Sequence, residues 1–119
     1  MDPKIIKALG DPKRFMLMQL MSRQGYCVSA LARLTELSES AVSQHLKIMR
    51  EAGLVSGEKR GYYTHYSVDK EMLDSIIAEL IQMRDSDRKP CFDPKSGCSE
   101  AKYIKCRAFT DPENNTKEE

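Results

Sequence analysis

The sequence predicts a mainly α-helical fold with one small β-hairpin, in a chain that pairs with a second copy of itself. Three observations support this prediction. An amphipathic helix occupies residues 39–52, a tyrosine-rich hairpin follows it directly, and a wide apolar stripe runs through residues 70–85. With 119 residues, of which 40% are hydrophobic, the chain can bury one modest core.

Two short helices are predicted first. Ile5, Ile6 and Leu9 form an apolar stripe that ends at a glycine. Asp11 and Pro12 are residue types preferred as the N-cap and the first residue of a helix, so they predict the start of the second. The apolar side chains of this second helix are expected in the core, and they are Phe15, Met16, Leu17, Met18, Leu20 and Met21.

Two further helices are joined by a tight turn. Residues 28–34 have apolar side chains at helical spacing, and residues 35–37 connect them to the next helix. Ser38 is its expected N-cap, and Gly53 is expected to end it in the left-handed conformation. Its apolar stripe consists of Val42, Leu46 and Met49, widened by Ile48 and Ala52. Together the two helices predict a helix-turn-helix.

The outward face of the second of these helices carries side chains that fit a DNA duplex. Short hydroxyl donors, an amide and cations bind base edges and phosphates in the major groove. A solvated helix face would more often carry Glu/Lys pairs. The residues predicted to contact DNA on this helix are Ser38, Ser40, Ser43, Gln44, His45, Lys47 and Arg50.

The hairpin predicted over residues 54–68 extends this DNA-binding unit. Its second arm is rich in tyrosine and β-branched residues. Lys59 and Arg60 are expected at its tip, where cations suit contact with phosphates or the minor groove. The whole is therefore predicted to be a dimeric winged helix-turn-helix, with double-stranded operator DNA as its partner.

Charge and hydropathy agree with this class. The formal net charge is only +1, but the cations of the recognition helix and hairpin are clustered, and acidic residues lie beyond them. We therefore expect DNA binding to be sensitive to salt. The sequence has no apolar run of about 18 residues and no long apolar segment at its start, which predicts a cytoplasmic protein with no membrane contact.

The apolar stripe of residues 70–85 is wide for a helix at the edge of a small domain. Such a surface usually marks a partner face, and here it predicts the homodimer contact. The stripe comprises Met72, Leu73, Ile76, Ile77, Leu80, Ile81 and Met83.

Three segments with different roles are predicted. Residues 1–88 form the DNA-binding and dimerisation domain, residues 89–109 a cysteine-containing tail, and residues 110–119 a polar end that is expected to be disordered. The tail holds Cys91, Cys98 and Cys106. Because disulfides are rare in a reducing cytoplasm, we interpret these thiols as a thiolate cluster. Soft thiolates favour trivalent arsenic or antimony, soft divalent metals, or an iron–sulfur cluster.

Geometry limits how the tail cysteines combine. On one continuous helix, residues 98 and 106 would be about 12 Å apart along the axis. Thiolates that share an ion lie only about 3.5 to 4 Å apart, given bonds near 2.3 Å. Residues 93–97 can form a loop between the first two cysteines. A helix over residues 99–107 would exclude Cys106 from the site of Cys98.

Several short motifs in a fixed order resemble the ArsR family of winged-helix repressors over residues 5–85. They are Ala8-Leu9-Gly10-Asp11-Pro12-Lys13-Arg14-Phe15, Leu31-Ala32, Ser43-Gln44-His45-Leu46-Lys47, Ala52-Gly53-Leu54-Val55 and Gly61. The resemblance implies a homodimer that binds an operator and releases it when an inducer binds, often a metal ion or metalloid. It also implies a dimer contact formed by the C-terminal and first helices. Glu36 stands where the family usually has glycine, which predicts slight backbone strain.

Cys27 is the fourth thiol, at the start of the first helix of the helix-turn-helix. Backbone N–H groups there lower a thiol pKa. Metal-sensing members of the family carry Cys-Val-Cys at this place, whereas this chain has Cys27-Val28-Ser29. The family's other common site, of Asp and His on the dimer helix, is missing. Two arrangements stay open: the three tail cysteines bind the inducer alone, or tail cysteines combine with Cys27.

Other sensing chemistries and other classes of protein were compared with this prediction. The same fold could sense oxidants or sulfur species through paired thiols, or carry an iron–sulfur cluster. An enzyme is not expected, because the sequence shows no nucleophile–base pair, phosphate-binding glycine loop or paired carboxylates. His45 and His65 have no second histidine at ligand spacing, so His45 is interpreted as a polar or phosphate-facing side chain.

Overall fold

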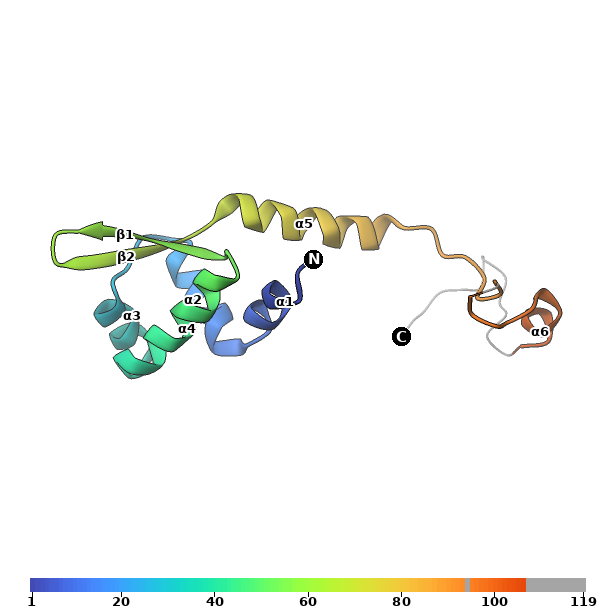
Figure 1. Cartoon of the computed structure of the whole chain (residues 1–119), viewed down its shortest axis with the longest axis horizontal. Coiled ribbons are helices and arrows are strands. Elements are labelled where there is room, and N and C mark those ends of the chain that lie inside the picture. The colour runs from blue at the N-terminus through green and yellow to red at the C-terminus, as the bar shows by residue number, and fades with distance from the viewer. Residues whose placement is uncertain (94, 107–119) are drawn as a thin grey trace. The chain divides into compact units, whose positions relative to one another are not determined.

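The computed structural model describes residues 1–93 and 95–106 and divides the chain into two compact units, Met1–Arg84 and Asp85–Glu119 (Figure 1). The helices and strands in chain order are α1 Pro3–Leu9, α2 Pro12–Met21, α3 Val28–Thr35, α4 Glu39–Glu51, β1 Val55–Arg60, β2 Tyr63–Val68, α5 Lys70–Asp85 and α6 Glu100–Lys105. The mainly helical fold with a single hairpin is confirmed within the described residues.

Side-chain caps define where the first two helices begin. Asp2 caps α1 by accepting a hydrogen bond from the backbone N–H of Lys4 at 2.8 Å. Asp11 caps α2 in the same way, through the N–H of Arg14 at 3.0 Å, and Pro12 is the first helical residue. The cap at Asp11 confirms the sequence prediction.

Helices α3 and α4 form the helix-turn-helix. The Ser38 hydroxyl accepts from the N–H of Ala41 at 3.0 Å, which confirms Ser38 as the N-cap of α4. Gly53 has a φ of +80°, and the N–H of Leu54 donates to the Met49 carbonyl at 2.9 Å. These two features are those of a Schellman motif, which satisfies carbonyls at the helix end and requires the left-handed residue.

Glu36 adopts the left-handed conformation that the family pattern implies for its position. Its φ is 60° and its ψ is 27°, at the C-cap of α3, and it is the one non-glycine residue with positive φ among those described. A residue with a Cβ pays a steric cost of about 1 kcal/mol there.

Replacing Glu36 with glycine is therefore expected to raise the free energy of unfolding, by up to about 1 kcal/mol, because the strain is relieved. The greater entropy of glycine in the unfolded chain offsets part of this gain. Thermal or urea unfolding monitored by circular dichroism measures it. A Glu36→Ala variant, which keeps the Cβ, is the control and should show no comparable gain.

Strands β1 and β2 form a two-stranded antiparallel sheet in which Arg60 pairs with Tyr63. The two-residue loop between them is Gly61 and Tyr62, and only Gly61 has a positive φ, of +67°. This pattern is that of a type II′ turn, whose first central position favours glycine. The predicted tip is corrected by this register: Lys59 and Arg60 belong to β1 and not to the turn.

The core of the first unit lies between α1–α4 and the base of the hairpin. Its fully buried large side chains are Leu17, Val42, Leu31, Leu46, Met49 and Leu54. Three residues expected to be apolar contacts are more exposed than predicted: Phe15, Met16, which is 37% exposed, and Ile48. Met16 and Ile48 each lie next to a buried residue in sequence, Leu17 and Met49, about 100° around the helix from it, and so turn away from the core.

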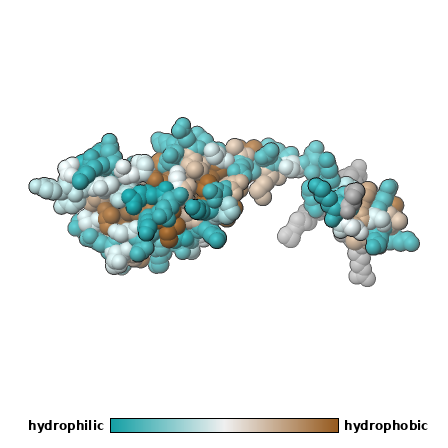
Figure 2. All heavy atoms as spheres, viewed as in Figure 1, coloured by the Kyte–Doolittle hydropathy of each residue, from teal (hydrophilic) through white to brown (hydrophobic). Residues whose placement is uncertain are grey.

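Helix α5 buries little of its apolar stripe within the chain. Ile76 is buried, whereas the side chains of Ile77, Leu80, Ile81 and Met83 are exposed. Apolar side chains accordingly show along α5 in the space-filling view (Figure 2). Among the described residues, no helix has the length and apolar character needed to cross a bilayer.

The described part of the second unit is a loop followed by a short helix. Ser99 caps α6 by accepting from the N–H of Lys102 at 3.1 Å. The rings of Phe92 and Tyr103 pack with their centroids 5.1 Å apart. The predicted helix after the second tail cysteine is present over Glu100–Lys105, while the segment predicted to be disordered, residues 110–119, lies outside the described residues.

Candidate DNA interface and thiol cluster

The outward face of α4 is open to solvent. Its apolar side, Val42, Leu46 and Met49, is buried in the core and fixes the orientation of the helix. Of the side chains predicted to contact DNA, six are exposed: Ser38, Ser40, Ser43, Gln44, Lys47 and Arg50. The helix therefore presents hydroxyls, an amide and cations on one rigid element, as base and phosphate contact requires.

His45 differs from these six because it is half-buried. Its Nδ1 atom lies 3.3 Å from Nη1 of Arg14, which comes from α2. The same guanidinium donates from Nε to the Ala8 carbonyl at 2.9 Å and from Nη2 to the Lys7 carbonyl at 3.1 Å. Arg14 thus connects the end of α1 to the middle of α4.

Asp11 lies beside this contact. The backbone N–H of Arg14 holds the pKa of the Asp11 carboxyl below its usual value, partial desolvation opposes this, and the positive charge of Arg14 lowers the pKa further. An anion therefore stands close to the cation that contacts α4.

The C-terminal end of α4 is connected to the hairpin. The Arg50 guanidinium lies 5.8 Å from the ring centroid of Tyr66 in β2, within the range of a cation–π contact. Tyr66 is buried and packs over Gly57, where a Cβ would come within 2.9 Å of its ring. The glycine thus lets Tyr66 approach β1 closely and keeps the hairpin beside the recognition helix.

The hairpin presents both charge and an aromatic ring to solvent. Lys59 and Arg60 are exposed, and Arg60 forms an ion pair with Glu58 at 2.9 Å. Because both partners are largely in water, this pair adds little stability, and the guanidinium can exchange it for a phosphate. Tyr62, at the tip, is 98% exposed.

The tail brings two of its three cysteines together. The Sγ atoms of Cys91 and Cys98 lie 3.8 Å apart. The loop between them is held by Asp93, whose carboxylate accepts from the N–H groups of Lys95 and Ser96 at 2.7 and 2.8 Å. Asp93 and Cys98 also form an isolated antiparallel bridge that closes the loop.

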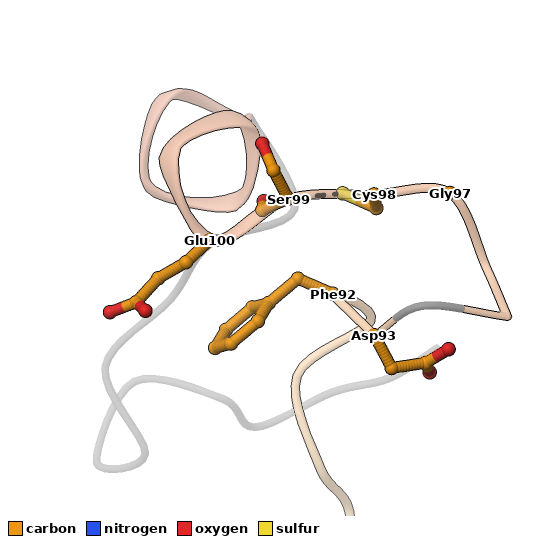
Figure 3. Close-up of a pocket in the computed structure, with 6 residues that line it drawn as sticks. All are labelled: Phe92, Asp93, Gly97, Cys98, Ser99 and Glu100. Carbon is orange, nitrogen blue, oxygen red and sulfur yellow. Dashed lines mark hydrogen bonds between the residues drawn. The ribbon is translucent and has the colours of Figure 1, made fainter.

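A shallow cavity of about 370 Å³ adjoins Cys98. Figure 3 shows Phe92 on one arm of the loop and Cys98, Ser99 and Glu100 on the other. Partial burial raises the pKa of the Cys98 thiol, and so do its hydrogen bond with Cys91 and the charges of Cys91 and Cys106. Within the described residues, no three His, Cys, Asp or Glu side chains are grouped closely enough to hold one ion.

Cys27 is the N-cap of α3, as expected for a thiol at the start of this helix. Its Sγ lies 3.3 Å from the Ser29 hydroxyl. That hydroxyl, followed by the backbone N–H of Ala30, lowers the pKa of the Cys27 thiol. The serine that replaces the second cysteine of the family motif therefore favours the thiolate at Cys27.

Sequence reasoning missed three residues of this surface. The sequence predicts no role for Arg14 beyond the family motif, and it predicts Tyr62 and Tyr66 only as residues of the hairpin. The exposed ring of Tyr62 could have been found from its place beside Gly61 in a two-residue turn. The contacts of Arg14 and Tyr66 depend on residues distant in sequence.

Helix α4 and the hairpin together define the class of DNA-binding protein. An exposed polar helix is anchored behind by the core and flanked by a basic hairpin, which is the arrangement of a winged helix-turn-helix. Proteins of this class bind duplex DNA with the second helix in the major groove.

Residues 11–56 match the model of the arsR family of bacterial regulatory proteins, and the chain belongs to that family. It is 38% identical to the HTH-type transcriptional regulator YgaV of Escherichia coli, over 64% of this chain and 78% of that protein. It is 35% identical to the arsenical resistance operon repressor of Bacillus subtilis, over 61% and 70%. A crystal structure of a "possible transcriptional regulator for arsenical resistance" superposes with a TM-score of 0.63 at 30% identity, covering 72% of this chain and 88% of that one.

Proposed function

We propose that this chain is a homodimeric transcriptional repressor that binds operator DNA in the cytoplasm and releases it when a thiophilic ion binds its cysteines. The observation that carries the sensing part is the 3.8 Å separation of the Cys91 and Cys98 sulfurs. This is the spacing of thiolates that share one ion, about 3.5 to 4 Å for bonds near 2.3 Å.

The apolar face of α5 supports the homodimer. Ile77, Leu80 and Ile81 repeat at helical spacing and are exposed, and Ile6 adds an exposed apolar side chain on α1. The N-terminal ammonium donates to Glu79 Oε1 at 3.1 Å, which places the start of α1 beside α5. Burying this surface against a second copy stabilises the pair by about 25 cal/mol per Å² of apolar area. It also provides two recognition helices for a two-fold symmetric operator.

The chemistry of the tail supports a soft inducer. Cys91 and Cys98 supply two adjacent sulfur donors, and sulfur ligands select arsenic, antimony or soft divalent metals over hard cations. Cys106 lies beyond α6 and is not grouped with them, so its use as a third donor requires the tail to rearrange when the ion binds. Cys106 follows α6 directly, and its charge acts on Cys98. Once assembled, three thiolates would suit a trivalent, three-coordinate ion. The name of the Bacillus subtilis relative is consistent with arsenic.

An ion bound to the cysteines can release DNA only if the ion-bound dimer has a lower affinity for the operator than the ion-free dimer. Such coupling is typically 1 to 3 kcal/mol, or about 5- to 150-fold. We propose that binding at the tail changes the angle between the two recognition helices, so that they no longer match successive major-groove sites.

The test measures binding of the full chain to a duplex that it selects from a random-sequence library, with arsenite, antimonite, zinc or cadmium added. At least one of these ligands is expected to weaken binding 5- to 150-fold. Cys91→Ser and Cys98→Ser should each abolish that response while leaving binding without ligand unchanged. Absence of a response to all four ligands contradicts the metal-sensor proposal.

The same variant series separates the two open ligand arrangements. If the tail cysteines act alone, Cys27→Ser retains the full response. If Cys27 is a ligand, this variant loses the response as the tail variants do. Thiolate charge-transfer absorption in the ultraviolet reports ligand binding directly in each variant.

The short sulfur–sulfur distance also favours a second candidate function, thiol-based sensing of oxidants or sulfur species. Oxidation of Cys91 and Cys98 to a disulfide would transfer two electrons and two protons to an added peroxide, which is reduced to water. Release of DNA by peroxide, reversed by a thiol reductant and absent with all four metal ligands, selects this alternative. An iron–sulfur cluster would instead give brown protein on anaerobic purification.

A further inference from the structure

The Arg14 guanidinium makes three contacts that join separate elements. It donates to the carbonyls of Lys7 and Ala8, which have no partner within the helix because they lie at the C-terminal end of α1. It also approaches Nδ1 of His45 at 3.3 Å. Residues 14 and 45 are both half-buried, so these contacts are partly shielded from water. One side chain therefore links α1, α2 and the recognition helix.

The contact assigns donor and acceptor roles to the two nitrogens of the His45 ring. Arginine carries only N–H donors and stays charged at all relevant pH values. In this contact Nδ1 of His45 is therefore the acceptor, and Nε2 is the nitrogen that can donate elsewhere. The His45 side chain is only half-buried, and it follows the exposed Gln44 on the same helix.

We propose that Arg14 is a positioning residue of the DNA interface: by donating to Nδ1, it holds the His45 ring with Nε2–H directed to the operator. This inference rests on the proposed DNA-binding function. It gives His45 the role of a hydrogen-bond donor, through Nε2, to a base edge or a phosphate. It also makes the placement of that donor depend on α1, whose terminal carbonyls hold the other side of the guanidinium.

A double-mutant cycle on operator affinity tests the proposal, with the full chain and the duplex selected by the wild type. Arg14→Gln and His45→Leu are each expected to weaken binding about tenfold, which corresponds to the loss of one hydrogen bond to a charged or well-placed group. Because Arg14 acts through His45, adding Arg14→Gln to His45→Leu should cause no further loss. Independent effects would instead multiply to about a hundredfold.

Two variants separate positioning from charge and from fold. Lys13→Gln removes a neighbouring exposed cation on the same helix and should weaken binding less than Arg14→Gln. His45→Gln keeps an acceptor for Arg14 and a donor for DNA, so it should retain affinity near that of the wild type. Because Arg14→Gln also frees two carbonyls, circular dichroism must show that it is folded at the assay temperature, and Arg14→Lys provides a second variant.

The outcomes are distinguishable from failure of the proposed function. If the wild type binds no duplex, DNA binding itself is wrong. If the wild type binds and the two substitutions multiply, or if His45→Gln weakens binding as much as His45→Leu, Arg14 does not act through His45 and the inference is overturned.

Discussion

Replacing Leu80 with aspartate is expected to leave each chain folded and to abolish tight operator binding. Leu80 is 55% exposed on the apolar face of α5, so its substitution disturbs little within the chain. In a dimer the same side chain would be buried against the partner, where an unpaired carboxylate is costly. Size-exclusion chromatography should show a monomer for this variant and a dimer for the wild type.

The loss of operator affinity is expected to be large. In a dimer, binding of one recognition helix brings the second to its half-site, whereas two monomers must bind the two half-sites independently. Linked binding modules typically gain 10²- to 10⁴-fold over one module, so a loss of at least about a hundredfold is expected. Ser75→Asp is the matched control, since Ser75 is exposed about 140° around α5 from Leu80. A Leu80→Asp variant that remained dimeric would show that the dimer contact lies elsewhere.

Local signals made much of the fold predictable. The caps at Asp11 and Ser38 and the left-handed Gly53 each depend on residues within one helical turn, and the structure has all three. The hairpin register was less accessible, because Lys59 and Arg60 could belong to strand or turn until Gly61 and Tyr62 were seen to form a two-residue loop.

The exact limits of the core were harder to predict than the helices. The helical spacing of apolar residues predicts which of them share a face. It does not predict the buried arc, which is the width of the sector of each helix that the core covers. Ile48 and Met16 lie at the margin of the buried arc and are exposed. The Met18 and Met21 side chains, nearer the centre of the arc, are buried as expected.

The candidate site also has features that the sequence predicts and features that depend on tertiary packing. The exposed polar residues of α4 could be predicted from helical spacing alone. The contact between Arg14 and His45 could not, because 31 residues separate them and only the packing of α2 against α4 brings them together. The proximity of Cys91 and Cys98 depends on the turn at Asp93 and Ser96, whose hydrogen bonds sequence reasoning did not foresee.

The largest expected effect on stability is that of Leu46→Ala. Leu46 is 1% exposed in the middle of α4, between core residues of the first unit. Truncating a buried leucine at its β-carbon loses the transfer free energy of the removed atoms and leaves a cavity. Together these lower the free energy of unfolding by about 2 to 5 kcal/mol. Since small domains are stable by only about 5 to 15 kcal/mol, a large share of the margin would be lost. Thermal and urea unfolding measure the change.

Ile48→Ala on the same helix is the matched control, because its side chain is 40% exposed and leaves a smaller void. We expect it to cost clearly less than Leu46→Ala, and equal costs would contradict the burial pattern of α4. Because operator DNA is expected to bind only the folded protein, excess operator should restore part of the stability that Leu46→Ala removes. The recognition helix is thus held by its buried face, and its affinity for DNA and the stability of the domain are coupled through the same residues.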